Sequence, residues 1–255
     1  MMSPAAISHD VDGPAARVEL SNAFDILADV VGRGVTFGLA GARDDVHLLD
    51  AELDARRSVH EFAWPQFGRG RHAAHAALER LGVGLRPVVS HHGAPSAGRD
   101  VVVSISHSGD SAVAAAARTS SHPLLGIDLQ CGPLAPTVAG VVANAEERWW
   151  LRVGGVVSGR RLTAMWSAKE AAFKAVGLGM TDEVGFLPPR NIRLVPCGSG
   201  FIARVPARWH VGDPQLRVHS VAVSHDSIMS LAIGTPGAAS SRAVRPCSWS
   251  EGEPA

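Results

Sequence analysis

Short runs of apolar and β-branched residues along the chain predict a series of strands. One run, residues 35–40 (VTFGLA), is bounded by glycines, and another, residues 101–117 (VVVSISHSGDSAVAAAA), predicts two strands around a tight turn at His107-Ser-Gly-Asp. Residues 122–130 (HPLLGIDLQ) predict a further strand that leads into a loop. The remaining strands are predicted at PVV (87–89), NIRLV (191–195), GFIARV (200–205) and residues 218–234.

Helical spacing of apolar residues dominates three other regions. Residues 48–81 are mostly helical in pattern, with a break near Trp64-Pro65 and a stop at Gly82. The other two are NAEERWWL (144–151) and RLTAMWSAKEAAFKAVGLG (161–179), the latter ending at Gly177 or Gly179. Because helices and strands do not alternate strictly, the pattern favours the α+β class over a doubly wound sheet.

A weak internal repeat relates residues 101–117 to residues 219–234. Each stretch carries Ser-His at a predicted strand end, then a short turn, then a small apolar strand. We interpret the repeat as two related α/β halves, residues 21–121 and 122–236, although two merely similar hairpins would give the same pattern. Residues 1–20 and 237–255 are poor in bulky apolar residues, so we expect a loose leader and a disordered tail.

Composition excludes several classes of protein. Lysine plus arginine number 24, as do aspartate plus glutamate, so no basic excess indicates a nucleic-acid partner. The three cysteines are too few and too scattered for a disulfide framework or a zinc site. No signal peptide is visible in residues 1–20, and no apolar run approaches the length of a membrane span. We therefore expect a cytoplasmic protein with no membrane partner.

Lysine is used in only one place. Just two of the 24 basic residues, Lys169 and Lys174, are lysines, and both fall within WSAKEAAFKA. Lysine differs from arginine as a compact point charge whose pKa can be tuned. Chance could place both lysines together, but the pair indicates a segment in which chemistry requires this side chain.

Two motifs place groups suited to metal and phosphate chemistry. Asp128 and Gln130 stand at i and i+2 of a predicted strand and so share one face. Trp166, Glu170 and Lys174 stand at i, i+4 and i+8 of a predicted helix and form one stripe. Two carboxylates and an amide oxygen are the hard donors that Mg²⁺ takes along with substrate phosphates. Singly, each motif also fits a structural role, as a surface Glu–Lys pair or as an aspartate at a strand end.

Other kinds of site fit less well. Ser106 and His107 end a strand at a glycine turn, where a hydroxyl and an imidazole can bond phosphate oxygens. With Asp110 they do not make a hydrolase triad, because adjacent side chains on a strand face opposite ways. His72 and His75, at i and i+3, could bind a metal, although solvated or core histidines are commoner at such spacing. The sequence contains no GxSxG elbow, P-loop or HExxH motif.

The motifs SISHSGD, GIDLQ and WSAKEAAFKA, in this order, resemble those of the 4′-phosphopantetheinyl transferases of the large, pseudo-dimeric, surfactin-synthetase-activating type. Upstream, FGRGRHAAHAALERLG resembles the F-x-x-G-R-x-x-A-R-x-A-L segment of that family, most closely in its siderophore-pathway branch. The resemblance runs from about Leu48 to Leu194. It implies two similar α/β halves that form an intramolecular pseudo-dimer around coenzyme A. Such a chain needs no second copy, so we expect a monomer.

The resemblance also implies an activity and its residues. A protein of this family would transfer the 4′-phosphopantetheine arm of coenzyme A to a serine of an apo acyl or peptidyl carrier protein, with Mg²⁺ as cofactor and 3′,5′-ADP as leaving group. Such carriers serve polyketide or nonribosomal peptide biosynthesis. Motif by motif, the implied roles are Asp128, Gln130 and Glu170 as metal ligands, Glu170 and Lys174 as catalytic groups, and Arg71, Ser106, His107 and Lys174 as contacts to coenzyme A.

Three positions depart from the family pattern. Gln130 stands where many members have a second acid, His75 replaces an arginine, and Ala94 replaces a basic residue found in some members. The neutral amide leaves the metal site one negative charge poorer. Two other functions therefore stay open: a relative that binds coenzyme A or a carrier domain without transferring anything, and a Mg²⁺-dependent phosphoesterase that acts on a pyrophosphate.

Overall fold

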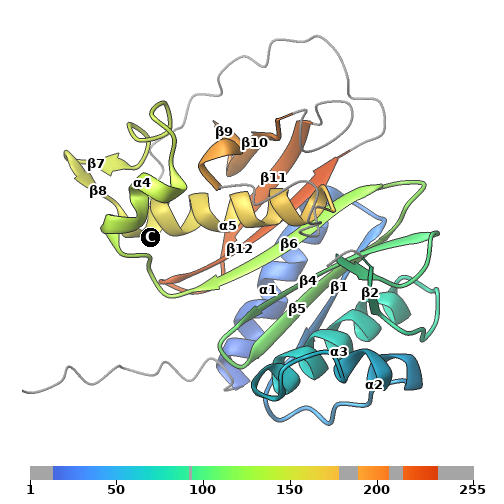
Figure 1. Ribbon diagram of the computed structural model, residues 1–255. Helices are drawn as coiled ribbons and strands as arrows, with labels where there is room; N and C mark the ends of the chain where they lie inside the picture. The colour runs from blue at the N-terminus through green and yellow to red at the C-terminus, as the bar shows by residue number, and fades with distance from the viewer. Residues whose placement is uncertain (1–13, 92–93, 178–188, 207–214, 235–255) are drawn as a thin grey trace, which may run out of the picture.

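Two antiparallel sheets lie side by side in the computed structural model, which describes residues 14–91, 94–177, 189–206 and 215–234 (Figure 1). The first sheet has the strand order β1-β5-β4, and the second has the order β6-β12-β11-β10-β9. The strands of the first are β1 (Val35–Ala40), β4 (Val101–Ser108) and β5 (Ser111–Arg118). Those of the second are β6 (Leu124–Cys131), β9 (Arg193–Cys197), β10 (Gly200–Arg204), β11 (Gln215–Ala222) and β12 (Ser227–Gly234).

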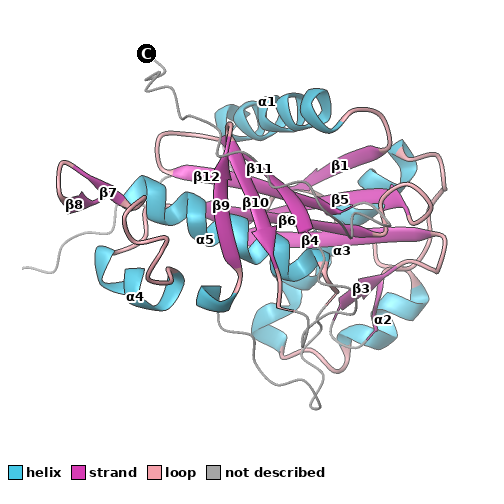
Figure 2. Ribbon diagram, turned by 90° about the horizontal axis from the view of Figure 1, so that it is seen from above, coloured by secondary structure: helices cyan, strands magenta, loops and turns pink. Residues whose placement is uncertain are grey.

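Three long helices cover the two faces of this layer (Figure 2). Helix α3 (Trp64–Arg80) packs on the first sheet and α5 (Gly159–Ala175) on the second, while α1 (Pro14–Val31) lies on the opposite face. The shorter elements are α2 (Asp50–Arg56), the 3₁₀ turns η1 (Glu61–Ala63), η2 (Pro136–Val138) and η3 (Pro189–Asn191), α4 (Ala139–Val142), and the hairpins β2–β3 (Val89–His91, Ala94–Ser96) and β7–β8 (Arg152–Val153, Val156–Val157). The α+β class predicted from the sequence is confirmed.

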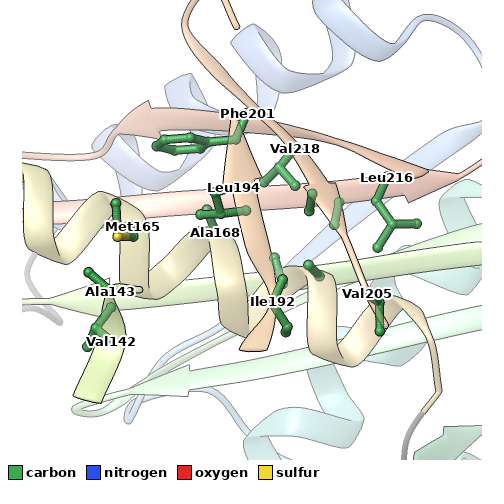
Figure 3. Packing of buried hydrophobic residues seen from close by; sticks show 14 of the residues in the cluster. Val142, Ala143, Met165, Ala168, Ile192, Leu194, Phe201, Val205, Leu216 and Val218 are labelled. Atoms are coloured by element: carbon green, nitrogen blue, oxygen red, sulfur yellow. The ribbon is translucent and has the colours of Figure 1, made fainter. Parts of the chain in front are cut away.

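Small apolar residues let the helices approach the strands closely. Strand β5 is buried from Ser111 to Ala117, with alternate side chains entering the core under α1 and the core under α3. A third core fills the space between α5 and the second sheet, where Met165, Leu194 and Val218 meet (Figure 3). The core under α1 takes side chains from both sheets, and it therefore holds them in one layer.

A glycine marks the same close contact in each half. A Cβ atom on Gly38 of β1 would lie 2.0 Å from the carbonyl oxygen of Ala73 in α3, and one on Gly126 of β6 would lie 2.0 Å from that of Ala171 in α5. In both halves this strand pairs with the second strand of a hairpin, β4–β5 or β11–β12. These parallels support a division of the chain into two equivalent halves between residues 121 and 122, in the connection between β5 and β6. The division itself stays a prediction.

The break predicted near Trp64-Pro65 is confirmed, because α2 ends at Arg56 and α3 begins at Trp64 with proline in its first turn. Three sequence-based expectations differ from the structure. Residues 14–20, assigned to a loose leader, form the first turns of α1, whose Leu20, Ala23, Phe24 and Leu27 are buried. Residues 144–151 form turns and no helix, and Glu147 accepts a hydrogen bond there from the backbone N–H of Asn144. Ser224-His225 lies in a turn, whereas Ser106-His107 lies on a strand. The tail predicted at 237–255 lies outside the described residues.

Candidate active site

A ladder of serine hydroxyls joins the two sheets. Ser104, Ser106 and Ser108 of β4 point toward β6 and accept hydrogen bonds from the backbone N–H groups of Ile127, Leu129 and Cys131, with donor–acceptor distances of 3.0, 3.1 and 3.0 Å. Both strands are sheet edges, so these N–H groups have no strand partner of their own. Alternate residues of a strand point the same way, so the serines at every second position of β4 all reach the neighbouring edge of β6.

Asp128 lies where this seam passes under α5. Its Oδ1 accepts hydrogen bonds from the Ser106 hydroxyl at 2.9 Å and from the Lys174 ammonium at 2.7 Å, and Lys174 also donates to Ser106 Oγ at 2.9 Å. Gly126, two residues earlier on the same face, permits α5 to approach β6 so closely that Lys174 reaches the aspartate. The structure therefore brings together three of the residues predicted from the sequence.

Ser106 uses all of its hydrogen-bonding capacity here. A hydroxyl has one donor and two acceptor sites, and Ser106 donates to Asp128 while accepting from Lys174 and from Leu129 N–H. The residue is also only 3 % exposed. Its predicted contact with coenzyme A phosphates would require the release of one of these bonds; within this structure its action is to orient Asp128 and Lys174.

Glu170 extends the cluster on α5. Burial raises the pKa of its carboxyl, the neighbouring Asp128 raises that pKa further, and Lys174 opposes the shift. The two carboxylates therefore repel each other across the strand–helix contact, as expected for groups whose charges are close and poorly solvated. Such repulsion is what a bound cation would relieve.

The residues present fit a divalent cation. Asp128 Oδ2 is buried without a hydrogen-bond partner among the described residues, and an orphaned carboxylate oxygen is costly unless a cation completes its shell. No group of three or more His, Cys, Asp or Glu side chains suited to a metal occurs in the described part of the chain. Magnesium needs no such cage, since it is commonly held by one or two carboxylates together with substrate phosphates and water.

Gln130 shares the face of Asp128 but makes a local contact. Its side-chain amide nitrogen donates to the backbone carbonyl of Cys131 at 3.2 Å, and the residue is partly exposed. No hydrogen bond joins it to Asp128, Glu170 or Lys174 among the described residues. Its place as a third metal ligand stays a prediction.

His107 points away from Ser106, into the contact between β4 and α3. Its ring bonds the backbone carbonyl of Gln66, and since Nε2 is buried with no partner, that bond is made by Nδ1. Desolvation lowers the pKa of His107 to about 4, and the charges of Lys174, Arg71 and Arg69 contribute to the shift. At neutral pH the ring is therefore uncharged and presents Nε2 as a buried acceptor beside cations.

Glycine at position 70 is what admits the imidazole. A Cβ atom there would lie 2.5 Å from His107 Nε2 and 3.1 Å from Ile105 Cγ2. Glycine inside a helix costs roughly 1 kcal/mol relative to alanine, so its presence in the middle of α3 calls for such a reason. The FGRG and SISHS motifs thus form two sides of one contact.

Arg71 is held beside this contact. Its Nε donates to the carbonyl oxygen of Val88 at 3.1 Å, and its guanidinium carbon lies 3.7 Å from the centre of the Phe67 ring. Burial lowers the pKa of Arg71, while Glu52 opposes that shift. His75, considered for a metal site, is buried against Glu52 with 2.8 Å between Nε2 and Oε1, which is a structural pair.

A pocket of about 220 Å³ opens beside Lys174 at the junction of the two halves. It is lined by the start of β6, the end of α5, and residues of β3 and β4, among them Pro95, Ile105, Leu124, Phe173 and Val176. Its walls are mainly apolar, and Lys174, whose ammonium bonds Asp128, is one of the lining residues.

Sequence reasoning missed several residues that build this site. Ser104 and Ser108 flank Ser106 with period two, a signal of a polar face on a buried strand. Gly70 and Gly126 were visible as glycines within regular elements, which often mark a close backbone approach. Lys169 was noticed as one of two lysines, but its complete burial was not expected.

Two protein-family models match this chain, and between them they cover the segments that contribute to the site. Residues 63–117 match the 4′-phosphopantetheinyl transferase N-terminal domain family, and residues 124–232 match the 4′-phosphopantetheinyl transferase superfamily. A stretch of 145 residues is 38 % identical to the 4′-phosphopantetheinyl transferase Svp of Streptomyces mobaraensis. That alignment covers 52 % of this chain and 56 % of the relative, so the chain matches little more than half the length of Svp. No helix in the described residues is long and apolar enough to cross a membrane.

Proposed function

This chain belongs to the 4′-phosphopantetheinyl transferase superfamily, and we propose that it transfers the 4′-phosphopantetheine arm of coenzyme A to a serine of an apo acyl or peptidyl carrier protein. The observation that carries the proposal is the cluster of Asp128, Ser106 and Lys174 at the junction of the two halves, with Glu170 beside it. Residues from both matched regions contribute to that cluster.

Coenzyme A would lie across the junction, with its phosphates toward the cations. Lys174 reaches the cluster from α5, while Arg71 and His107 lie on the α3 side of β4. The pocket beside Lys174 is smaller than the roughly 300–1,000 Å³ of pockets that hold a whole drug-sized ligand, so it suits one portion of the coenzyme. A phosphate near His107 Nε2 would favour protonation of the ring, which would then donate to it.

Asp128 and Glu170 would hold Mg²⁺, with Gln130 as a possible third oxygen donor. Bound there, the cation would neutralise charge on the pyrophosphate and relieve the repulsion between the two carboxylates. The unpaired Oδ2 of Asp128 and the raised pKa of Glu170 support this assignment.

Glu170 is the general base in the proposed reaction. Burial raises the pKa of Glu170, and a more basic carboxylate accepts a proton more readily. The carrier serine gives its hydroxyl proton to Glu170, and its oxygen forms a bond to the β-phosphorus of coenzyme A. The bond from that phosphorus to the oxygen of the α-phosphate breaks, and 3′,5′-ADP leaves. Lys174, already fixed by Asp128 and Ser106, stabilises the negative charge that grows on the phosphoryl oxygens.

The test is to incubate the full chain with coenzyme A, Mg²⁺ and a panel of apo acyl and peptidyl carrier proteins, followed by intact-protein mass spectrometry. Transfer adds about 340 Da to one carrier serine, because the group is joined covalently. Chelation of the metal should abolish this gain, and substitution of the carrier serine by alanine should prevent it.

Two other results would contradict the proposal. Tight coenzyme A binding with no mass gain on any carrier would indicate a binding protein that does not transfer the group. Release of 3′,5′-ADP in the absence of a carrier, at the rate seen in its presence, would indicate a phosphoesterase.

A further inference from the structure

Lys169 is completely buried, although it stands next to Glu170 in the sequence. Its ammonium donates to Glu147 Oε2 at 2.6 Å and to the carbonyl oxygen of Val142 at 2.8 Å. Val142 is the last residue of α4, so this carbonyl has no partner within its own helix. The lysine therefore joins α5 to the connection that follows β6, and it does not face the substrate.

Glu147 makes this contact a three-way junction. One carboxylate oxygen accepts from the backbone N–H of Leu194 in β9 at 2.7 Å, and the other accepts from that of Asn144 at 2.9 Å as well as from Lys169. Val142 and Leu194 belong to the apolar cluster under α5 (Figure 3). Three separate segments are thus tied to α5 at the position just before Glu170.

The N-terminal half holds a similar device, with a histidine in place of the lysine. Glu52 is fully buried, accepts from the backbone N–H groups of Leu49 at 3.0 Å and Val88 at 2.7 Å, and pairs with His75 of α3. Each half therefore ties its long helix to a neighbouring segment through a buried glutamate: to β9 at Leu194 in one half, and to Val88 just before β2 in the other. In the C-terminal half the tie adjoins a proposed metal ligand, whereas in the N-terminal half it adjoins Arg71, a predicted coenzyme A contact whose Nε bonds the carbonyl oxygen of Val88.

We propose that Lys169 is a positioning residue for Glu170: through Glu147 and Val142 it sets the rotation and depth of α5 on β6, and so the separation of Glu170 from Asp128. This rests on the proposed function, in which both carboxylates hold Mg²⁺. A buried ion pair can often be replaced by apolar residues without loss of stability, so a contribution to stability alone does not account for the Lys169–Glu147 pair. Partners that orient a metal ligand from behind typically change metal affinity about 10–100-fold when removed.

The sign of the effect separates this role from a purely electrostatic one. Removal of a positive charge near a cation site would tighten Mg²⁺ binding, because the lysine repels the ion. Loss of positioning would weaken Mg²⁺ binding. A role in stability alone would leave the affinity unchanged once folding is restored.

The experiment measures Mg²⁺ binding by calorimetry to full-length protein saturated with coenzyme A, with no carrier present. Lys169→Met should weaken Mg²⁺ binding by about tenfold or more, while coenzyme A binding without metal stays within about twofold of wild type. The double variant Glu147→Gln with Lys169→Met removes the uncompensated charge and keeps an acceptor for Leu194 N–H. It should regain most of the melting temperature and still bind Mg²⁺ weakly.

Glu52→Gln is a control for the glutamate change in the double variant, since it replaces the corresponding buried glutamate of the other half. It should lower the melting temperature and leave Mg²⁺ affinity unchanged. Recovery of Mg²⁺ affinity together with stability in the double variant would overturn the positioning role, as would tighter binding in Lys169→Met. If Lys169→Met does not fold, the Mg²⁺ affinity of the double variant alone tests the positioning role. If the wild-type protein binds no Mg²⁺, the metal site of the proposed function is contradicted, and the positioning role of Lys169 falls with it.

Discussion

Acid should destabilise this protein through one histidine. The pKa of His107 is lowered from 6.5 to about 4, because its ring is buried beside Gly70 and near three cations. Between these two pKa values the unfolded chain binds a proton that the folded protein does not. Stability linked to His107 is therefore complete above the unfolded pKa and is lost as the pH falls toward the folded one.

The size of this effect follows from the shift. One pKa unit corresponds to about 1.4 kcal/mol, so the full difference between pKa 6.5 and about 4 amounts to about 3 kcal/mol, and about 2 kcal/mol of it is lost by about pH 5. His107→Asn removes the titrating group and keeps an amide that can donate to the Gln66 carbonyl, in place of Nδ1. The variant has lower stability at neutral pH, because a small cavity remains, but a flatter dependence on pH.

Urea unfolding of both proteins at a series of pH values measures the difference directly. Other groups, such as Glu52 and Asp44, titrate in both proteins and cancel in the comparison. The free energies of unfolding should converge by about 2 kcal/mol between about pH 7 and pH 5. Parallel curves for wild type and variant would refute the buried, neutral ring, and would instead favour a histidine that is charged or solvent-exposed in the folded state.

Four further predictions concern the proposed site. Asp128→Ala and Glu170→Ala should each lower transfer by at least about 100-fold while the fold, checked by circular dichroism, is retained, and near-normal turnover would place the metal elsewhere. Glu170→Gln should raise the melting temperature of metal-free protein at neutral pH. The pKa of Glu170 is raised in the folded protein, so ionisation of this carboxyl destabilises the fold as the pH rises, and glutamine cannot ionise. A lower melting temperature would contradict the repulsion between Glu170 and Asp128. Gly70→Ala should weaken coenzyme A binding by displacing His107, whereas Gly140→Ala, where a Cβ meets nothing within 4 Å, should not. Gln130→Glu should lower the Mg²⁺ concentration for half-maximal rate and Gln130→Leu should raise it, while equal titrations would remove Gln130 from the site.

Much of the site was accessible from sequence because its motifs are local. A strand with Asp128 and Gln130 on one face, and a helix with Glu170 and Lys174 one turn apart, follow from side-chain periods of 2 and 3.6. A β-rich run bounded by glycines located β1, and a glycine turn signal placed the turn between β4 and β5. The first helix escaped notice because its apolar residues are interspersed with small and polar ones in an N-terminal segment.

What the sequence by itself determined is therefore the order of the elements and the kind of chemistry their side chains can supply. Only the tertiary structure decided which groups meet. Lys174 reaches Asp128, 46 residues away, because Gly126 lets α5 lie against β6. It also decided that two lysines five positions apart take opposite roles, one toward the site and one buried with Glu147. Contacts of this kind depend on how closely two surfaces pack, and no periodicity within one element encodes the distance to another.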